Sequence, residues 1–155
     1  MIDLNMKKPT GIYKVIGRIH LIYNYIIINI ICSPLPPGRL KNWLLRRTGM
    51  DVGKDAWINP QCVFDPLNPK KITIENGAFL GWGCRLMAHV IVPSDEGGYD
   101  YKEGKITIKS KAFVGGFSTV LPSTTVEGML YNNSLANKDV PKDEKWAGVP
   151  AKQIG

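Results

Sequence analysis

The chain has 155 residues and a formal net charge of +7, with 20 Lys and Arg against 13 Asp and Glu. That length suits one domain whose core needs no disulfide or metal to hold it together. The only two histidines, His20 and His89, exclude a metal site built on three histidines. Sixteen Gly and eleven Pro favour strands and turns. The basic charge favours an anionic partner, and three scattered cysteines favour reduced thiols in a cytosolic protein.

The first 49 residues are predicted to form an N-terminal helical segment. Residues 12–32 place nine apolar side chains on one helical face: Ile12, Val15, Ile16, Ile19, Ile22, Tyr23, Ile26, Ile27 and Ile30. Lys14 and Arg18 lie opposite, and the uncharged run 21–33 is too short to span a bilayer. Two interpretations stay open, a helix that packs on its own domain or on another subunit, and a helix that lies in a membrane interface. In the second case we expect a cytoplasmic protein at the inner face of a membrane.

A second, short helix is expected over residues 39–48, between the Pro-rich break at 34–38 and Gly49. Leu40, Trp43 and Leu44 share one face, and Arg46 and Arg47 lie near its C-terminal end, where cations are favoured. These arginines form either a solvated basic end or a contact with anionic lipid or substrate.

From residue 50 onward, large aliphatic or aromatic residues recur every six positions. The runs are Val52, Ile58, Phe64; Ile74, Leu80, Leu86, Val92; and Ile108, Val114, Val120, Val126. Small residues usually follow four places later, and Gly often follows directly. Neither a helix nor a plain strand has this period, so it predicts a solenoid with short sides, sharp corners and stacked coils in residues 50–155.

The pattern resembles the hexapeptide-repeat acyltransferases over residues 39–154, in particular the branch of maltose, galactoside and xenobiotic O-acetyltransferases. Six pieces carry the resemblance, in order: 44–49 (LLRRTG), 58–64 (INPQCVF), 112–116 (AFVGG), 120–122 (VLP), 138–141 (KDVP) and 147–152 (AGVPAK). The resemblance implies an all-β solenoid, namely a left-handed parallel β-helix with N-terminal helices and a C-terminal tail. It also implies homotrimers and acetyl-CoA as acyl donor without a metal, with polysaccharide modification as the setting.

The repeat is interrupted at residues 65–71 and by a longer polar loop at residues 93–105. Loops on solenoids often gather on one functional face. The resemblance implies that the longer loop walls the acceptor site; a solvated excursion is the alternative.

His89 comes just before the longer loop. The resemblance implies that it is the general base, which takes a proton from an acceptor hydroxyl during direct transfer in a ternary complex. Histidine suits this role because it titrates near neutral pH. The sequence does not choose between a backbone carbonyl and a loop carboxylate as the group that orients the imidazole.

The resemblance also implies the binding residues. Asn59 and Phe113 correspond to acceptor-site positions, although each also suits a structural role. The residues that bind CoA in the family correspond to Gly116, Asn132, Asn137, Lys138 and Lys152 of this sequence. A departure at 131–133 (YNN in place of the family's Gly-Ala-Gly) puts Asn132 in doubt and could narrow the CoA groove.

The sequence therefore predicts an acyl-CoA-dependent O-acetyltransferase that acts on a saccharide or a similar hydroxyl compound. A sugar-nucleotide N-acetyltransferase and a non-catalytic trimeric scaffold are the alternatives. A γ-class carbonic anhydrase is excluded because it requires three histidines. Nucleic-acid binding is not expected, because no basic motif interleaved with aromatic residues occurs.

Overall fold

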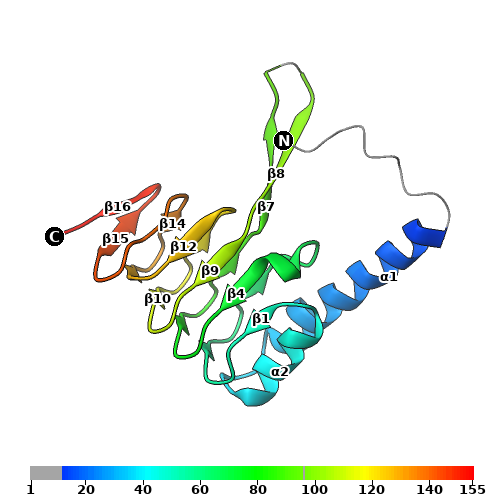
Figure 1. Ribbon diagram of the computed structural model, residues 1–155, viewed down its shortest axis with the longest axis horizontal. Coiled ribbons are helices and arrows are strands. Elements are labelled where there is room, and N and C mark those ends of the chain that lie inside the picture. The colour runs from blue at the N-terminus through cyan, green and yellow to red at the C-terminus, as the bar shows by residue number, and fades with distance from the viewer. Residues whose placement is uncertain (1–11, 96) are drawn as a thin grey trace.

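The computed structural model describes residues 12–95 and 97–155, with side chains from Gly17 onward (Figure 1). The predicted roles of Ile12, Lys14, Val15 and Ile16 therefore lie outside the described side chains. Helix α1 (Ile12–Tyr25) continues into the π-helical η1 (Ile26–Cys32), and α2 (Arg39–Arg47) follows the Pro-rich break. Among these residues, none of the helices has the length and hydropathy that crossing a membrane requires.

Sixteen strands follow, most of them two or three residues long. They are β1 (Asp51–Val52), β2 (Trp57–Ile58), β3 (Val63–Phe64), β4 (Ile72–Ile74), β5 (Phe79–Leu80), β6 (Arg85–Leu86), β7 (His89–Pro93), β8 (Tyr99–Glu103), β9 (Ile106–Ile108), β10 (Phe113–Val114), β11 (Thr119–Val120), β12 (Thr124–Val126), β13 (Met129–Leu130), β14 (Leu135–Ala136), β15 (Lys145–Gly148) and β16 (Ala151–Gln153). A short 3-10 helix, η2 (Pro69–Lys71), precedes β4.

Apart from the β7–β8 hairpin, the strands up to β14 join three sheets in strict rotation. The first sheet holds β1, β4, β9 and β12, the second β2, β5, β10, β13, β15 and β16, and the third β3, β6, β11 and β14. All neighbours in these sheets pair in parallel except β15 and β16 at the C-terminal end. The chain thus forms stacked, three-sided coils, and we name each corner by the sheet that it follows (Figure 1).

The six-residue anchors form the interior of these coils. Ile58, Leu80, Val114 and Leu130 are in register along the second sheet, and all four are fully buried. Burial of such side chains is the main stabilising contribution of each coil. One predicted anchor is wrong: Val92 lies in β7 of the hairpin and is only half-buried, because the chain leaves the coil after the second pass through the third sheet.

Close approach of successive coils explains why glycine follows several anchors. A Cβ built on Gly81 would lie 2.4 Å from the backbone nitrogen of Gly116, and one on Gly115 would lie 2.4 Å from that of Asn132. No side chain fits at such distances, so both positions require glycine.

The helices close the N-terminal end of the coil stack through buried polar side chains of α2. The Lys41 ammonium is 2% exposed and donates hydrogen bonds to the carbonyl oxygens of Leu35 (3.0 Å) and Asn59 (2.9 Å). Asn42 donates to three carbonyl oxygens of the first corner, within residues 53–56. Burial lowers the pKa of Lys41. These bonds satisfy backbone groups that would otherwise be orphaned at the end of the solenoid.

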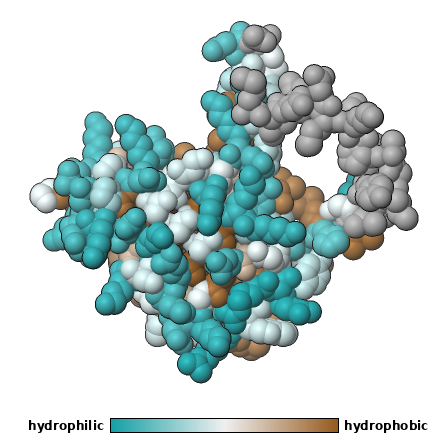
Figure 2. All heavy atoms as spheres, in the orientation of Figure 1, coloured by the Kyte–Doolittle hydropathy of each residue, from teal (hydrophilic) through white to brown (hydrophobic). Residues whose placement is uncertain are grey.

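The outer face of α1 and η1 carries apolar side chains that nothing in the described chain covers. Ile28 and Cys32 are buried against the coils, whereas five others on the opposite face are 40–59% exposed: Ile19, Ile22, Tyr23, Ile26 and Ile30. In Figure 2 the hydrophobic atoms gather on the side of the molecule where Figure 1 places the helices. From Gly17 onward the predicted apolar face is therefore present but largely exposed, and the segment contacts the coils through Ile28 and Cys32 instead.

The second interruption is more ordered than the polar loop expected at 93–105. Strands β7 and β8 pair antiparallel, with His89 opposite Glu103, so the excursion is a β-hairpin that begins at His89 itself. It projects away from the coil stack (Figure 1). The consecutive β-branched residues Val90, Ile91 and Val92 are the signal that favours a strand there.

Candidate active site

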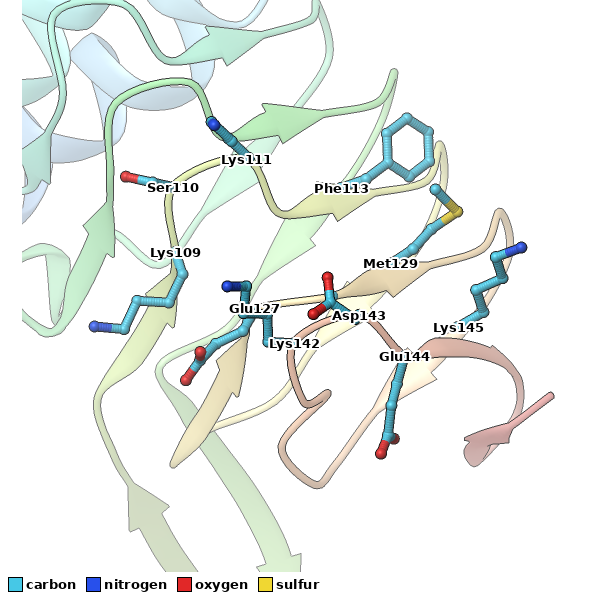
Figure 3. A pocket seen from close by; sticks show the side chains of 11 residues that line it. Lys109, Ser110, Lys111, Phe113, Glu127, Met129, Lys142, Asp143, Glu144 and Lys145 are labelled. Atoms are coloured by element: carbon cyan, nitrogen blue, oxygen red, sulfur yellow. The ribbon is translucent and has the colours of Figure 1, made fainter. Parts of the chain in front are cut away.

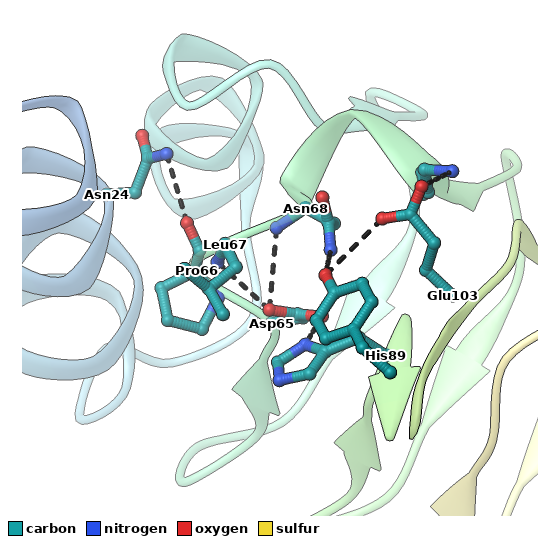
Figure 4. A network of polar contacts seen from close by, with 9 residues as sticks. Asn24, Asp65, Pro66, Leu67, Asn68, His89 and Glu103 are labelled. Atoms are coloured by element: carbon teal, nitrogen blue, oxygen red, sulfur yellow. Dashed lines mark hydrogen bonds and ion pairs between the residues drawn. The ribbon is translucent and has the colours of Figure 1, made fainter. Parts of the chain in front are cut away.

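The most distinctive polar pair in the structure joins the two interruptions at the third corner. Nδ1 of His89 is hydrogen-bonded to Oδ2 of Asp65, which directly follows β3 (Figure 4). Phe64 and Leu86 are in register, so the corners of the first and second coils stack and bring these two residues together. The Asp65 side chain is fully buried, whereas 15% of the His89 side chain is exposed.

The surroundings of Asp65 hold its carboxylate in a single orientation. Oδ1 accepts hydrogen bonds from the backbone N–H groups of Leu67 (2.9 Å) and Asn68 (3.4 Å). These bonds and the imidazole offset the desolvation of a buried carboxylate. An ionised carboxylate only accepts hydrogen bonds, so this contact favours the tautomer of His89 that carries its proton on Nδ1 and has the lone pair on Nε2.

A tyrosine of the hairpin covers one face of the imidazole, and hydrogen bonds fix its hydroxyl. The Tyr101 ring stacks on His89 with a centroid distance of 5.3 Å and an interplanar angle of 13°. Its hydroxyl accepts a hydrogen bond from Nδ2 of Asn68 (2.6 Å) and donates one to Glu103 (3.3 Å), which is paired with Lys71 (2.8 Å). Burial raises the pKa of Tyr101, and the Lys71 bond lowers the pKa of Glu103. The phenol thus stays protonated beside an ionised carboxylate.

Within the described residues, Nε2 of His89 has no hydrogen-bond partner. It is a partly exposed, correctly oriented base that can take a proton from a hydroxyl group within hydrogen-bond reach. The sequence left open which group orients the ring; Asp65 is that group.

Asn59 lies at a different corner of the coils from His89. It directly follows β2 at the second corner, and its side-chain amide donates to the carbonyl oxygen of Leu80 (2.9 Å). A single chain therefore does not bring Asn59 and His89 into one site, and its amide is engaged in bonding the first coil to the second.

Phe113 projects from the second sheet and stacks on Phe79, with the centroids 4.9 Å apart. It also lines a hollow of about 340 Å³ at the first corner, together with Met129 and several charged side chains (Figure 3). Those charged residues are Lys109, Lys111, Glu127, Lys142, Asp143, Glu144 and Lys145. Within one chain, Phe113 is thus not a wall of the His89 site.

Two of the residues expected to bind CoA bond to each other. The backbone N–H of Gly116 donates to Oδ1 of Asn132 (2.9 Å), so this donor is already used within the chain. The unusual 131–133 segment keeps the geometry of the second corner, because Asn133 has the same positive φ (56°) as Phe117 (58°) in the coil before it.

The other three expected CoA residues are exposed. Asn137 and Lys138 follow β14 at the third corner and so lie on the same edge as His89, two coils further on. Lys152 lies in β16 beyond them. The predicted roles of these residues remain predictions.

Neither metal nor thiol chemistry is supported by the described residues. They contain no group of three or more His, Cys, Asp or Glu side chains that could hold a metal ion. All three cysteines are buried and free. Burial, only partly offset by the charge of Lys41, raises the pKa of Cys32 to about 11, which keeps that thiol protonated at neutral pH.

Sequence reasoning missed Asp65, Asn68 and Tyr101 as parts of the site. A signal for Asp65 was present, since it is an acidic residue directly after an anchor, one coil below the corner that leads to His89. The contributions of Asn68 and Tyr101 depend on how two segments fold over the ring: residues 65–71, which we call the detour, and the hairpin. No local pattern encodes this folding.

Comparison with known proteins places this arrangement in a class of folds. No protein-family model matches the sequence, and no curated protein matches it. Among solved structures, a hexapeptide-repeat acetyltransferase of Vibrio cholerae complexed with acetyl-CoA aligns at a TM-score of 0.72 and 16% identity, over 96% of this chain and 91% of that one. A galactoside acetyltransferase in complex with coenzyme A aligns at a TM-score of 0.63 and 18% identity, over 91% and 78%. A mutant N-acyltransferase of Bacillus cereus in complex with dTDP and coenzyme A aligns at 0.57 and 15%, over 68% and 72%.

These likenesses confirm that the chain has the fold of the hexapeptide-repeat acetyltransferases, with parallel sheets and N-terminal helices. The resemblance expected from the repeat is thereby confirmed at the level of the fold. The solved relatives named above were each determined with coenzyme A or acetyl-CoA bound.

Proposed function

We propose that this protein is an acyltransferase that moves an acetyl group from acetyl-CoA to a hydroxyl group of a saccharide or a related acceptor. The observation that carries the proposal is the pairing of His89 with the buried Asp65, at an interrupted corner of hexapeptide coils. The left-handed sense of the coils belongs to the same proposal.

In the proposed reaction, Nε2 of His89 takes the proton of the acceptor hydroxyl as that oxygen attacks the thioester carbonyl. A carbon–oxygen bond forms and the carbon–sulfur bond breaks. The departing thiolate then takes the proton from the imidazolium, so the base is restored. Asp65 stabilises the transient imidazolium and keeps Nδ1 protonated. No enzyme nucleophile is needed because the thioester is already activated, and proximity supplies much of the rate.

A closed trimer supports this reaction better than a single chain. His89 lies on the third corner and Asn59 on the second, so a site that contains both requires two copies. Cyclic assembly satisfies this requirement with identical contacts. We place coenzyme A in the groove between copies, beside the exposed Asn137, Lys138 and Lys152, with Gly116 and Asn132 on the adjacent edge.

O-acetylation is favoured over N-acetylation by the base. A hydroxyl oxygen must lose its proton as it attacks, whereas the lone pair of a neutral amine attacks directly. A positioned imidazole with an open Nε2 therefore contributes more to O-transfer. An amino sugar acceptor is the alternative, and matched hydroxyl and amino sugars distinguish the two.

The test is the release of free thiol from acetyl-CoA in the presence of free sugars, sugar phosphates, nucleotide sugars and lipid-linked sugars. We expect release with at least one acceptor and calorimetric binding of coenzyme A without any acceptor. If no acceptor supports release and coenzyme A does not bind, the protein is a non-catalytic scaffold and the proposal fails.

We also propose that the outer face of α1 and η1 lies on an anionic membrane at the inner side of the cell envelope. Ile22, Ile26 and Ile30 supply the exposed apolar face, and Arg47 of α2 supplies nearby positive charge. Flotation with vesicles that contain anionic lipid should carry the full-length protein upward, and Ile22→Asp/Ile26→Asp should abolish flotation. Wild-type protein that stays at the bottom contradicts membrane contact.

A further inference from the structure

A hollow of about 920 Å³ lies between α1, the end of α2 and the detour that follows Asp65. Its walls differ in chemistry. Ile19 and Tyr23 of α1 form an apolar side, whereas Arg47, Lys70 and Lys71 bring three cationic side chains. No carboxylate is among its lining residues. The volume is in the range that small ligands occupy in proteins.

Two of the three cations are not neutralised. Lys71 is paired with Glu103, but neither Arg47 nor Lys70 makes an ion pair within residues 17–95 and 97–155. Arg47 instead lies over the Trp43 ring, with its guanidinium carbon 5.8 Å from the centroid, which leaves its donors available. Two unpaired cations that line one hollow favour a ligand with a concentrated negative charge, and a guanidinium matches phosphate oxygens in particular.

Two side chains connect the hollow to the imidazole. Asn68 lines the hollow and donates to the Tyr101 hydroxyl (2.6 Å), and the Tyr101 ring stacks on His89. In Figure 4 Asn24 of α1 lies on one side of Asn68, and Glu103 of the hairpin lies on the other. Asn68 and Tyr101 therefore connect the hollow to the imidazole through two direct contacts.

We propose that the acceptor is a saccharide that carries a phosphate or diphosphate group, and that Arg47 and Lys70 bind this group while His89 acts on a hydroxyl of the sugar. The inference rests on the proposed acyltransferase function, whose acceptor it specifies. The recognition chemistry is the same for a soluble sugar phosphate and for a sugar diphosphate linked to a lipid. The apolar wall of Ile19 and Tyr23 accommodates the first carbons of a lipid in the second case.

The test compares a matched pair of probes, N-acetylglucosamine and N-acetylglucosamine 1-phosphate, by calorimetry on the full-length protein loaded with coenzyme A. We expect the phosphorylated sugar to bind at least about 10-fold more tightly, and Arg47→Gln/Lys70→Gln to remove about 10-fold of that affinity. The matched control is Lys54→Gln/Lys109→Gln, which removes two positive charges from the first corner and should leave the affinity unchanged. Equal affinity for the two sugars, or an equal loss in the control, overturns the inference.

A second experiment distinguishes a soluble sugar phosphate from a lipid-linked sugar diphosphate as the acceptor. Turnover is compared between N-acetylglucosamine 1-phosphate in solution and undecaprenyl-diphosphate-linked N-acetylglucosamine in vesicles. A raised KM in Arg47→Gln/Lys70→Gln for either source, with the KM for acetyl-CoA unchanged, supports the inference and identifies the source. Phosphate-dependent binding without any turnover supports the binding site and contradicts the acyltransferase function. Efficient turnover of unphosphorylated sugar, unaffected by the variant, keeps that function and overturns the inference.

Discussion

The interior of the coils is built from apolar side chains that repeat, whereas the third corner of the first two coils is built from polar side chains that do not. In the interior, Ile58, Leu80 and Val114 repeat one apolar solution in register, and each is fully buried. At the corner, the repeat stops twice and the chain buries a carboxylate, Asp65, against a histidine. The comparison teaches that the repeat supplies a regular frame, whereas the residues of the proposed chemistry lie where the repeat is interrupted.

The two regions also differ in energetics. Each interior anchor stabilises the fold through area removed from water. Asp65 costs desolvation free energy, which two backbone N–H groups and the imidazole offset. A substitution in the interior should therefore reduce stability, and one at the corner should reduce turnover.

The largest expected effect is that of His89→Ala, which removes the proposed base. We expect kcat to fall by roughly 10²–10⁴. The midpoint of urea unfolding should fall as well, because Asp65 stays buried and loses the imidazole that offsets part of its desolvation, but the native fold should be retained. Thiol release and circular dichroism measure the two quantities. Unchanged turnover contradicts the role of His89.

Leu80→Ala tests the interior in the same way. Its side chain is fully buried, so we expect the free energy of unfolding to fall by about 2–5 kcal/mol. The matched control is Leu67→Ala in the detour, where the side chain is 50% exposed and the loss should be below about 1 kcal/mol. Both variants are compared at one protein concentration, because assembly contributes to stability. Equal losses would show that the coils are not the frame described here.

Asp65→Asn tests the corner without changing its shape, because the two side chains have nearly the same size. The substitution changes which nitrogen of His89 carries the proton. An asparagine amide facing Nδ1 favours the tautomer that carries its proton on Nε2, which removes the lone pair of the base. We expect kcat to fall on the order of 10²-fold. In a His89→Ala background the same substitution should have no further effect on kcat, and an additive loss contradicts action through the imidazole.

The smallest expected effect is that of Tyr101→Phe. The ring keeps its stacking on His89, and only the bonds of the hydroxyl to Asn68 and Glu103 are lost. We expect kcat to change by no more than a few-fold, in line with the loss of ordinary hydrogen bonds. A loss as large as that of His89→Ala would make the phenol itself a proton donor or acceptor in the reaction.

The sequence predicts the frame better than the site for a physical reason. A six-residue period reflects burial repeated in every coil, and it predicted the glycines at close approaches and every anchor except Val92. The N-terminal helices were predicted separately, from an apolar helical face and from the Pro and Gly residues that bound the second helix. The site depends on single contacts between distant segments. His89 was predicted through the resemblance, but its partner Asp65 becomes visible only when the register of Phe64 with Leu86 is known.

The same limit explains the two errors in the path of the chain. Val92 continues the period by spacing, yet it belongs to the hairpin, where it pairs with Asp100 of β8. The loop expected at 93–105 is polar in composition, but Tyr99–Glu103 within it form β8 and pair with β7. Local pattern alone did not decide between one more turn of the coil and a hairpin.

The central claim is that an imidazole fixed by Asp65 faces a thioester held between two copies of the chain. A crystal structure of the full-length protein with coenzyme A bound tests it most directly. We predict a trimer in which the coenzyme sulfur lies beside Nε2 of His89, with room for one acceptor hydroxyl between them and Nδ1 still bonded to Asp65. Coenzyme A bound away from every His89, or an imidazole turned away from the groove between copies, would contradict the account.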